Sequence, residues 1–145
     1  MRGMPGHRGR RALGAGLVAA VALGAAGAMV LAYGAPAPST SIVIRIHYSH
    51  FDPSAISVPV GVPVTITLIN DDPIDHEWIV GDDAVQQRHR TGTELLHPAR
   101  PTEQVIPAMS TRVTTITFAQ TGQLKYICHL PAHEAYGMVG LVTIR

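Results

Sequence analysis

The sequence of 145 residues is poor in cysteine and, beyond its first residues, in positive charge. It contains a single cysteine, so no internal disulfide can form and no disulfide pattern indicates the compartment. Eleven lysines and arginines stand against ten acidic residues, but four arginines lie within residues 1–11, which leaves seven basic residues elsewhere. The remainder therefore lacks the basic stripe that neutralises phosphates, which excludes nucleic acid as a partner.

The first 35 residues differ in composition from the rest. An arginine-rich start precedes an uncharged, Ala- and Gly-rich run over 12–35, a pattern typical of an export segment. We predict a signal peptide, cleaved after Gly34, or a retained membrane anchor, because the run is long enough to span a bilayer. The positive-inside rule then places residues 36–145 in the periplasm or on the outer face of the cytoplasmic membrane. Arg10 and Arg11 leave both Sec and twin-arginine export open.

Residues 36–145 have room for one compact domain, and they contain no internal repeat and no amphipathic helix of useful length. Apolar residues alternate with others at 42–47, 64–69 and 113–118, and this period of two with β-branched side chains indicates strands. Shorter runs of the same kind lie at 55–60, 77–80, 104–106, 124–128 and 139–144. Seven or eight strands in so short a domain predict an all-β, two-sheet sandwich. The segment 81–102 lacks periodicity and is expected to be a long excursion with one helical turn.

The one cysteine stands in the stretch CHLPAHEAYGM, between the last two predicted strands. Cys128, His133 and Met138 are spaced as Cys-x4-His-x4-Met, so a short loop could wrap all three around one ion. A fourth ligand must come from elsewhere, and His76 is the best candidate because the sandwich could bring it to the same end. Two imidazoles and a thiolate with a weak thioether make up a type 1 copper site. We therefore predict one copper ion bound by His76, Cys128, His133 and Met138.

These residues resemble the cupredoxins, and specifically the single-domain blue copper proteins. The resemblance covers residues 50–145, and its most specific element is the upstream histidine combined with Cys-x4-His-x4-Met before Val-Gly-Leu-Val. The four-residue gaps look more like the rusticyanin type than like plastocyanin. The resemblance implies a Greek-key sandwich with copper near one end, and it supports His76, which taken alone would be read as a surface histidine. Glu77 departs from the family, which often has a neutral hydrogen-bonding residue there.

The other histidines are weaker candidates for metal ligands. His129 neighbours Cys128 and should point to the other side of the strand, in a structural or surface role. Four histidines without paired ligand spacing are expected on the surface or in loops: His47, His50, His89 and His97. A second, weak metal site involving His89 and His97 stays open as an alternative. A multicopper oxidase is excluded because Ile127 precedes the cysteine where those enzymes place a histidine, and because no His-x-His pair occurs.

What these residues predict is electron transfer without catalysis, in a protein that is not an enzyme. The chain would cycle between Cu(II) and Cu(I), as a monomer that docks transiently with a redox donor and acceptor near His133. An apolar patch should surround that histidine: Leu130, Pro131, Ala132, Ala135, Tyr136 and Gly137. Copper storage or delivery is the alternative. Asn70, Asp75 and Glu77 lie near His76 in sequence and are expected to orient it.

Overall fold

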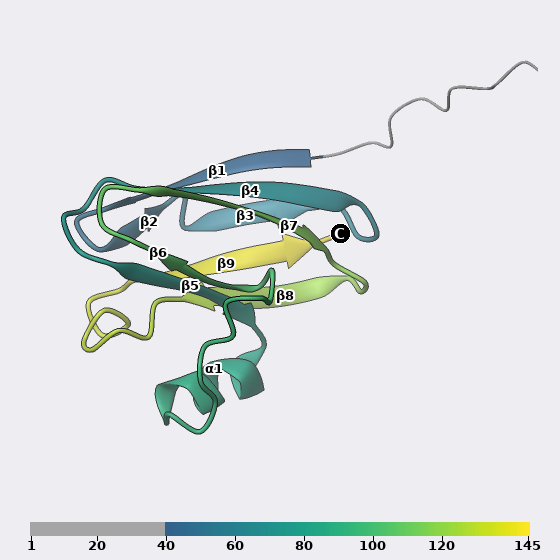
Figure 1. Cartoon of the computed structure of the whole chain (residues 1–145). Coiled ribbons are helices and arrows are strands. Elements are labelled where there is room, and N and C mark those ends of the chain that lie inside the picture. The colour runs from purple at the N-terminus through teal and green to yellow at the C-terminus, as the bar shows by residue number, and fades with distance from the viewer. Residues whose placement is uncertain (1–39) are drawn as a thin grey trace, which may run out of the picture. The chain divides into compact units, whose positions relative to one another are not determined.

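The computed structural model describes residues 40–145, and the predicted export segment over 1–35 lies outside them. Nine strands and one helix follow one another in this part of the chain (Figure 1). The strands are β1 (Thr40–His47), β2 (His50–Asp52), β3 (Ala55–Val58), β4 (Pro63–Asn70), β5 (His76–Gly81), β6 (Glu103–Ile106), β7 (Thr111–Thr117), β8 (Gly122–Ile127) and β9 (Val139–Ile144), and the helix is α1 (Asp83–Arg90).

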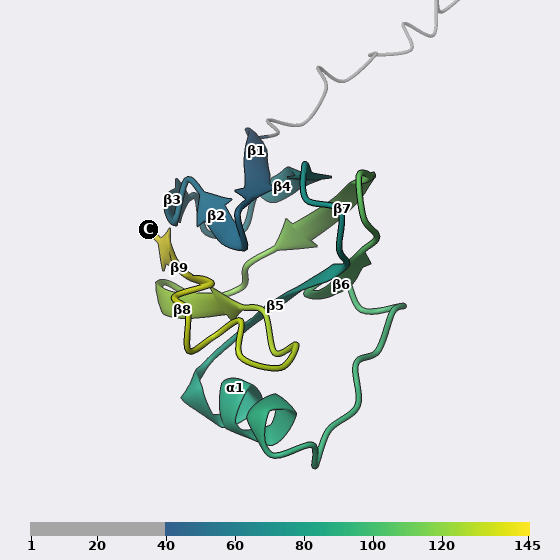
Figure 2. The same cartoon turned by 90° about the vertical axis from the view of Figure 1, so that its left-hand side faces the viewer.

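The strands form two sheets that pack face to face, with the order β2-β1-β4-β7 in one and β3-β9-β8-β5-β6 in the other (Figure 2). Two pairs are parallel, β1 with β4 and β3 with β9, and the other pairs are antiparallel. The predicted all-β Greek-key sandwich is confirmed. In Figure 1 the β1–β2, β4–β5, β6–β7 and β8–β9 connections lie together at one end, so residues distant in sequence meet there.

The core forms because the strands alternate buried and exposed residues. In β4, Val64, Ile66, Leu68 and Asn70 are buried, while the residues between them are partly exposed. Trp78 on β5 and Tyr126 on β8 are the largest fully buried side chains. Burying an apolar side chain of this kind stabilises the fold by roughly 1.5–3 kcal/mol. The core therefore fixes the two sheets against each other and holds the end that carries the loops.

Gly140 shows how closely the last two strands pack. A Cβ at this position would lie 2.0 Å from Cζ of Tyr126, so only glycine leaves room for that ring. The Tyr126 hydroxyl donates a hydrogen bond of 2.7 Å to the carbonyl oxygen of Pro53. The β8–β9 pair, which carries the Cys-x4-His-x4-Met loop, is thereby fixed against the segment before β3.

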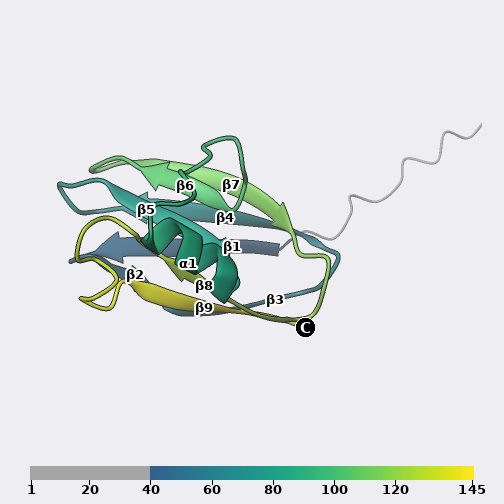
Figure 3. The ribbon, with the colours of Figure 1, turned by 90° about the horizontal axis from the view of Figure 1, so that it is seen from below.

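The 81–102 segment contains a two-turn helix, which is longer than the single turn predicted. The Asp82 carboxylate caps α1 by accepting a hydrogen bond from the Val85 N–H, 2.9 Å away. Gln86 is the one residue of α1 that is buried as a whole, and its amide donates to the carbonyl oxygens of Ile79 and Lys125. The helix therefore attaches to β5 and β8 through a polar side chain, and Figure 3 shows it lying against these strands.

Within residues 40–145 the structure contains no helix that is both long enough and apolar enough to cross a membrane.

Candidate metal centre

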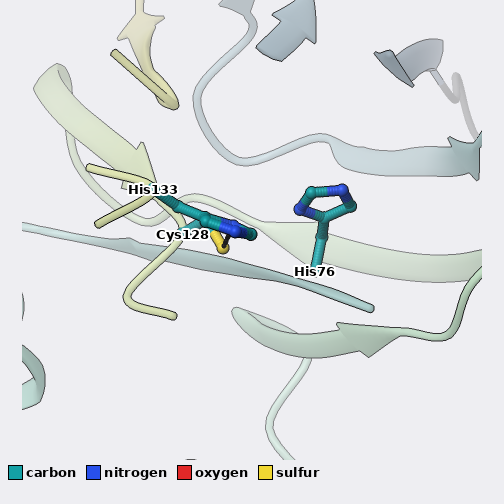
Figure 4. Close-up of side chains that lie close together, drawn as sticks. All are labelled: His76, Cys128 and His133. Carbon is teal, nitrogen blue, oxygen red and sulfur yellow. Dashed lines mark hydrogen bonds between the residues drawn. The ribbon is translucent and has the colours of Figure 1, made fainter. Parts of the chain in front are cut away.

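Three of the predicted ligands lie together at the loop end of the sandwich. His76 begins β5, Cys128 directly follows β8, and His133 lies in the loop before β9. One ligand atom from each of these side chains lies within 4.8 Å of the other two. Figure 4 shows the two imidazole rings beside the sulfur, and their centroids are 5.0 Å apart. His76 and Cys128 are fully buried, whereas His133 is partly exposed.

The ring of His76 is oriented by Asp72. His76 Nε2 lies 2.9 Å from Asp72 Oδ2, while the buried Nδ1 has no hydrogen-bond partner. The same carboxylate accepts hydrogen bonds from the N–H groups of Tyr48 and Ser49, both 2.7 Å long. Burial alone would raise the pKa of Asp72, but these bonds and His76 lower it below its usual value. The ionised carboxylate thus binds Nε2 and leaves Nδ1 directed at the other ligands.

The sulfur of Cys128 is held between two strands and the loop. Its Sγ accepts a hydrogen bond of 3.3 Å from the Glu77 N–H and lies 3.2 Å from Nδ1 of His133. Burial raises the pKa of the Cys128 thiol. A bound cation would have the opposite effect, because a coordinating thiol loses its proton.

The loop turns tightly enough to bring Met138 back to the cysteine. The Cys128 N–H donates to the Met138 carbonyl oxygen at 3.3 Å, and the Met138 N–H donates to the carbonyl oxygen of His133 at 3.0 Å. Ala132 and Gly137 have positive φ angles of 69° and 93°, a conformation that glycine adopts without strain. Met138 is fully buried in the same core cluster as Cys128, and its backbone bonds place it beside Cys128 and His133.

Comparisons with known proteins agree with this geometry. A sequence model described as copper binding proteins of the plastocyanin/azurin family matches residues 39–145. The chain belongs to this cupredoxin family. It is 30% identical over 115 residues to the copper-resistant cuproprotein CopI of Rubrivivax gelatinosus, covering 77% of this chain and 69% of that protein.

Solved structures show the same fold. Auracyanin B superposes with a TM-score of 0.63 at 21% identity, covering 77% of this chain and 91% of that one. A reduced auracyanin from the photosynthetic bacterium Roseiflexus castenholzii gives a TM-score of 0.62 at 23% identity, with coverage of 73% and 97%. At these identities the likeness concerns the fold alone, and it supports the cupredoxin sandwich.

The predicted copper cofactor is confirmed by the family, and the residues present fit it. His76 Nδ1 is buried without a partner, and a metal ion would supply one. The gathered donors are two imidazoles and a thiol, and together with the thioether of the buried Met138 they make up the set that type 1 copper prefers. The residues that would hold one copper ion are therefore His76, Cys128, His133 and Met138.

Other contacts attach the cupredoxin loop to α1. His129 Nε2 lies 2.8 Å from Gln86 Oε1, and its side chain is only 6% exposed. Arg90 donates two hydrogen bonds to the Glu134 carboxylate, of 2.9 and 2.5 Å. Because His129 follows Cys128 and Glu134 follows His133, the helix holds the residues next to these two ligands. Of the structural or surface role predicted for His129, the buried contact with Gln86 fits the structural one.

Sequence reasoning missed the residue that orients His76. Asp72 does so, whereas Asp75 instead accepts a hydrogen bond of 2.9 Å from the Ala108 N–H. Asn70 acts indirectly, because its amide oxygen accepts from the Asp72 N–H at 2.9 Å. Glu77 contributes through its backbone N–H, so its side-chain charge does not remove the bond to sulfur. A spacing of four residues between Asp72 and His76 was the available signal.

The expectation for the other histidines needs one correction. His47 and His97 have side chains about half exposed, at 54% and 43%, and His50 is also exposed. His89 was expected on the surface or in a loop, but its side chain is only 3% exposed. His89 is part of α1, and its ring faces inward and stacks on that of His129, with centroids 5.9 Å apart.

Proposed function

We propose that this protein is an electron carrier outside the cytoplasmic membrane and that it does not catalyse a reaction. The observation that carries the proposal is the prearranged donor set, with a partnerless Nδ1 of His76 facing Cys128 and His133. When bound, copper supplies a one-electron couple between Cu(II) and Cu(I). Ligands fixed by a β scaffold move little when the charge of the ion changes, which favours rapid electron transfer. Export through residues 1–35, cleaved or retained as an anchor at 12–35, belongs to the same proposal.

The partly exposed His133 is the proposed exit for the electron. Around it the loop presents exposed apolar or small residues: Pro131, Ala132, Ala135, Tyr136 and Gly137. Tyr136 is 71% exposed. The acidic Glu134 in this patch is paired with Arg90, which reduces its net charge. A small, weakly charged surface suits a redox partner that binds briefly and dissociates quickly.

Copper storage or delivery in copper resistance is the second candidate. It is supported by the names of two relatives, the copper-resistant cuproproteins CopI of Rubrivivax gelatinosus and of Pseudomonas aeruginosa. Against it stands the burial of Cys128 and His76, because a protein that hands over its ion needs ligands accessible to the acceptor. Electron transfer is therefore the function that the site supports best.

Repeated redox cycling separates the two candidates. The chain is first loaded with one equivalent of Cu(II). It is then reduced with ascorbate and reoxidised several times in the presence of a Cu(I) chelator. The visible absorption band is recorded in every cycle. An electron carrier should regain its full colour in every cycle and lose no copper. Release of copper to the chelator at the first reduction would overturn electron transfer in favour of delivery. A colourless copper complex would overturn the type 1 site itself.

A further inference from the structure

A second group of metal-ligating side chains lies away from the copper site. His89 is near the end of α1, Glu94 follows the helix, and Glu103 begins β6. One ligand atom from each lies within 4.8 Å of the other two. We call these three residues the carboxylate cluster. The copper site and its function do not use them.

The ring of His89 packs on a neighbouring ring, but this packing does not explain the surroundings of its Nε2 nitrogen. Its side chain is 3% exposed, and Nε2 is buried without a hydrogen-bond partner. That nitrogen lies 3.8 Å from Oε1 of Glu103, which is too far for a hydrogen bond. The ring is fixed by its stacking on His129. A buried nitrogen without a partner costs free energy, and an ion between it and the carboxylates would remove that cost.

The two carboxylates are ready to bind a cation. Glu103 is 3% exposed, and its Oε2 accepts hydrogen bonds from His97, from the backbone N–H at 2.6 Å and the ring Nδ1 at 3.1 Å. Oε1 is the oxygen that faces His89. Hydrogen bonds from Arg88 and Arg100 lower the pKa of Glu94 to about 2. Burial alone would raise the pKa of Glu103, but its bonds from His97 and Arg100 hold it below the usual value. Both groups therefore carry negative charge at neutral pH, as metal-binding carboxylates must.

A positive charge already occupies the cluster. Arg100 Nη1 donates to Glu94 Oε1 at 2.7 Å and to Glu103 Oε1 at 2.8 Å. The Arg100 side chain is 50% exposed, so it can turn outward into water without uncovering the core. A divalent ion carries more charge in a smaller volume than a guanidinium, so it can replace the guanidinium between the two carboxylates.

We propose that His89, Glu94 and Glu103 bind one divalent first-row cation, Zn²⁺ or Cu²⁺, in exchange for the guanidinium of Arg100. One imidazole and two carboxylates are a donor set for such ions. Metal–ligand bonds of about 2.0–2.2 Å require the three donors to approach one another by roughly an ångström, which the partly exposed Glu94 allows. His97 supports the site by holding Glu103. The sequence-based pairing of His89 with His97 is thereby replaced by His89 with two carboxylates.

Zinc titration of the full chain tests the proposal. The copper site is first filled with one equivalent of Cu(I), and Zn²⁺ binding is then measured by isothermal titration calorimetry. We expect one further ion per chain. Zn²⁺ affinity should fall at least tenfold in His89→Phe, which keeps an aromatic ring against His129, and in Glu94→Gln. His47→Ala, at a half-exposed histidine outside the cluster, is the matched control and should bind Zn²⁺ as the unchanged chain does.

Arg100→Gln gives a result that a purely structural cluster would not produce. Removing the competing cation should raise Zn²⁺ affinity several-fold, although it deletes two hydrogen bonds of the folded chain. No further zinc ion, equal affinity in the His89 and Glu94 variants, or weaker binding in Arg100→Gln would each overturn the proposal. Because these variants leave His76, Cys128 and His133 unchanged, the outcome is independent of the proposed electron transfer.

Discussion

The copper site and the carboxylate cluster are both compact groups of ligands on one β scaffold, but they satisfy their charges in different ways. At the copper site His76 Nδ1 has no partner, and the Cys128 sulfur accepts a hydrogen bond from the Glu77 N–H and lies beside His133. In the carboxylate cluster both acids are already bonded to Arg100. A metal meets no competing cation at the first group, whereas it must displace an arginine at the second.

The difference lies in where each group is fixed. The copper ligands are on or beside central strands of a packed sandwich, and Asp72 holds His76 from the interior. The carboxylate cluster joins an excursion to the edge strand β6, and its arginines reach it from the solvent. The copper site, whose buried ligands lack other partners, should hold its metal permanently. At the carboxylate cluster, whose ligands are salt-bridged, metal occupancy should depend on the metal concentration.

Removal of the thiolate should have the largest effect. Cys128→Ser should abolish the intense visible band of the Cu(II) protein, because copper–thiolate bonding produces it, even where the histidines still bind the ion. Glu94→Gln, which alters the carboxylate cluster alone, should keep the band at full intensity. Absorption spectra of both variants after addition of one equivalent of Cu(II) check this. Full colour in Cys128→Ser would disprove the ligand assignment.

Loss of the charge that orients His76 should weaken copper binding without removing it. Asp72→Asn keeps the size of the side chain but removes its negative charge, and a change of this kind beside a ligand costs about 10–100-fold in metal affinity. Asp75→Asn is the matched control, because Asp75 bonds the Ala108 N–H rather than His76. Competition with a chelator measures both affinities, and equal values for the two variants would contradict the role of Asp72.

Substitution of Met138 should shift the reduction potential of the copper protein while the copper stays bound. Met138→Gln supplies a harder oxygen that favours Cu(II), so the potential should fall; Met138→Leu removes the thioether, so it should rise. One electron is transferred, so a shift of about 59 mV corresponds to a tenfold change in relative affinity for the two oxidation states. Voltammetry checks this, and shifts in the same direction would show that Met138 is not a weak axial ligand.

Acid should affect the carboxylate cluster modestly. The pKa of Glu94 is about 2 when folded and about 4.5 when unfolded, so its contribution to stability is present above about pH 4.5 and is lost as the pH falls towards 2. Because the two arginines paired with Glu94 are about half exposed, water screens these ion pairs and the effect is small. Glu94→Gln should therefore reduce the loss of thermal stability between pH 5 and pH 2.5 by a few degrees at most. Identical melting profiles for the two chains would contradict this.

Much of the fold could be predicted because apolar residues alternate with others along most strands, and this alternation indicates which face of the strand is buried. β9 was predicted with its observed bounds, and β4 to within one residue at each end. β2 has three residues, too few for a period of two to be visible. The helix α1 was underestimated because it buries Gln86 rather than an apolar stripe, so no helical period appears in its sequence.

The copper ligands were predictable because three of them lie in one loop, so their spacing can be seen directly in the sequence. Their partners were not, because Asp72 and Gln86 act through contacts set by tertiary packing. The burial of His89 likewise follows from how α1 packs on β8, which no local pattern encodes. Sequence spacing thus finds groups that are close along the chain, and it misses those brought together by the sheets.

The position of β9 sets an order of events during biosynthesis. This strand lies between β3 and β8, and it pairs with β3 in parallel across more than eighty residues of chain. The second sheet cannot close until β9 has been synthesised, and only its pairing with β8 brings Met138 back to Cys128. Contacts between such distant segments form late in folding. A nascent chain still lacking β9 therefore presents a cysteine and histidines but no metal centre, and copper capture awaits the final strand.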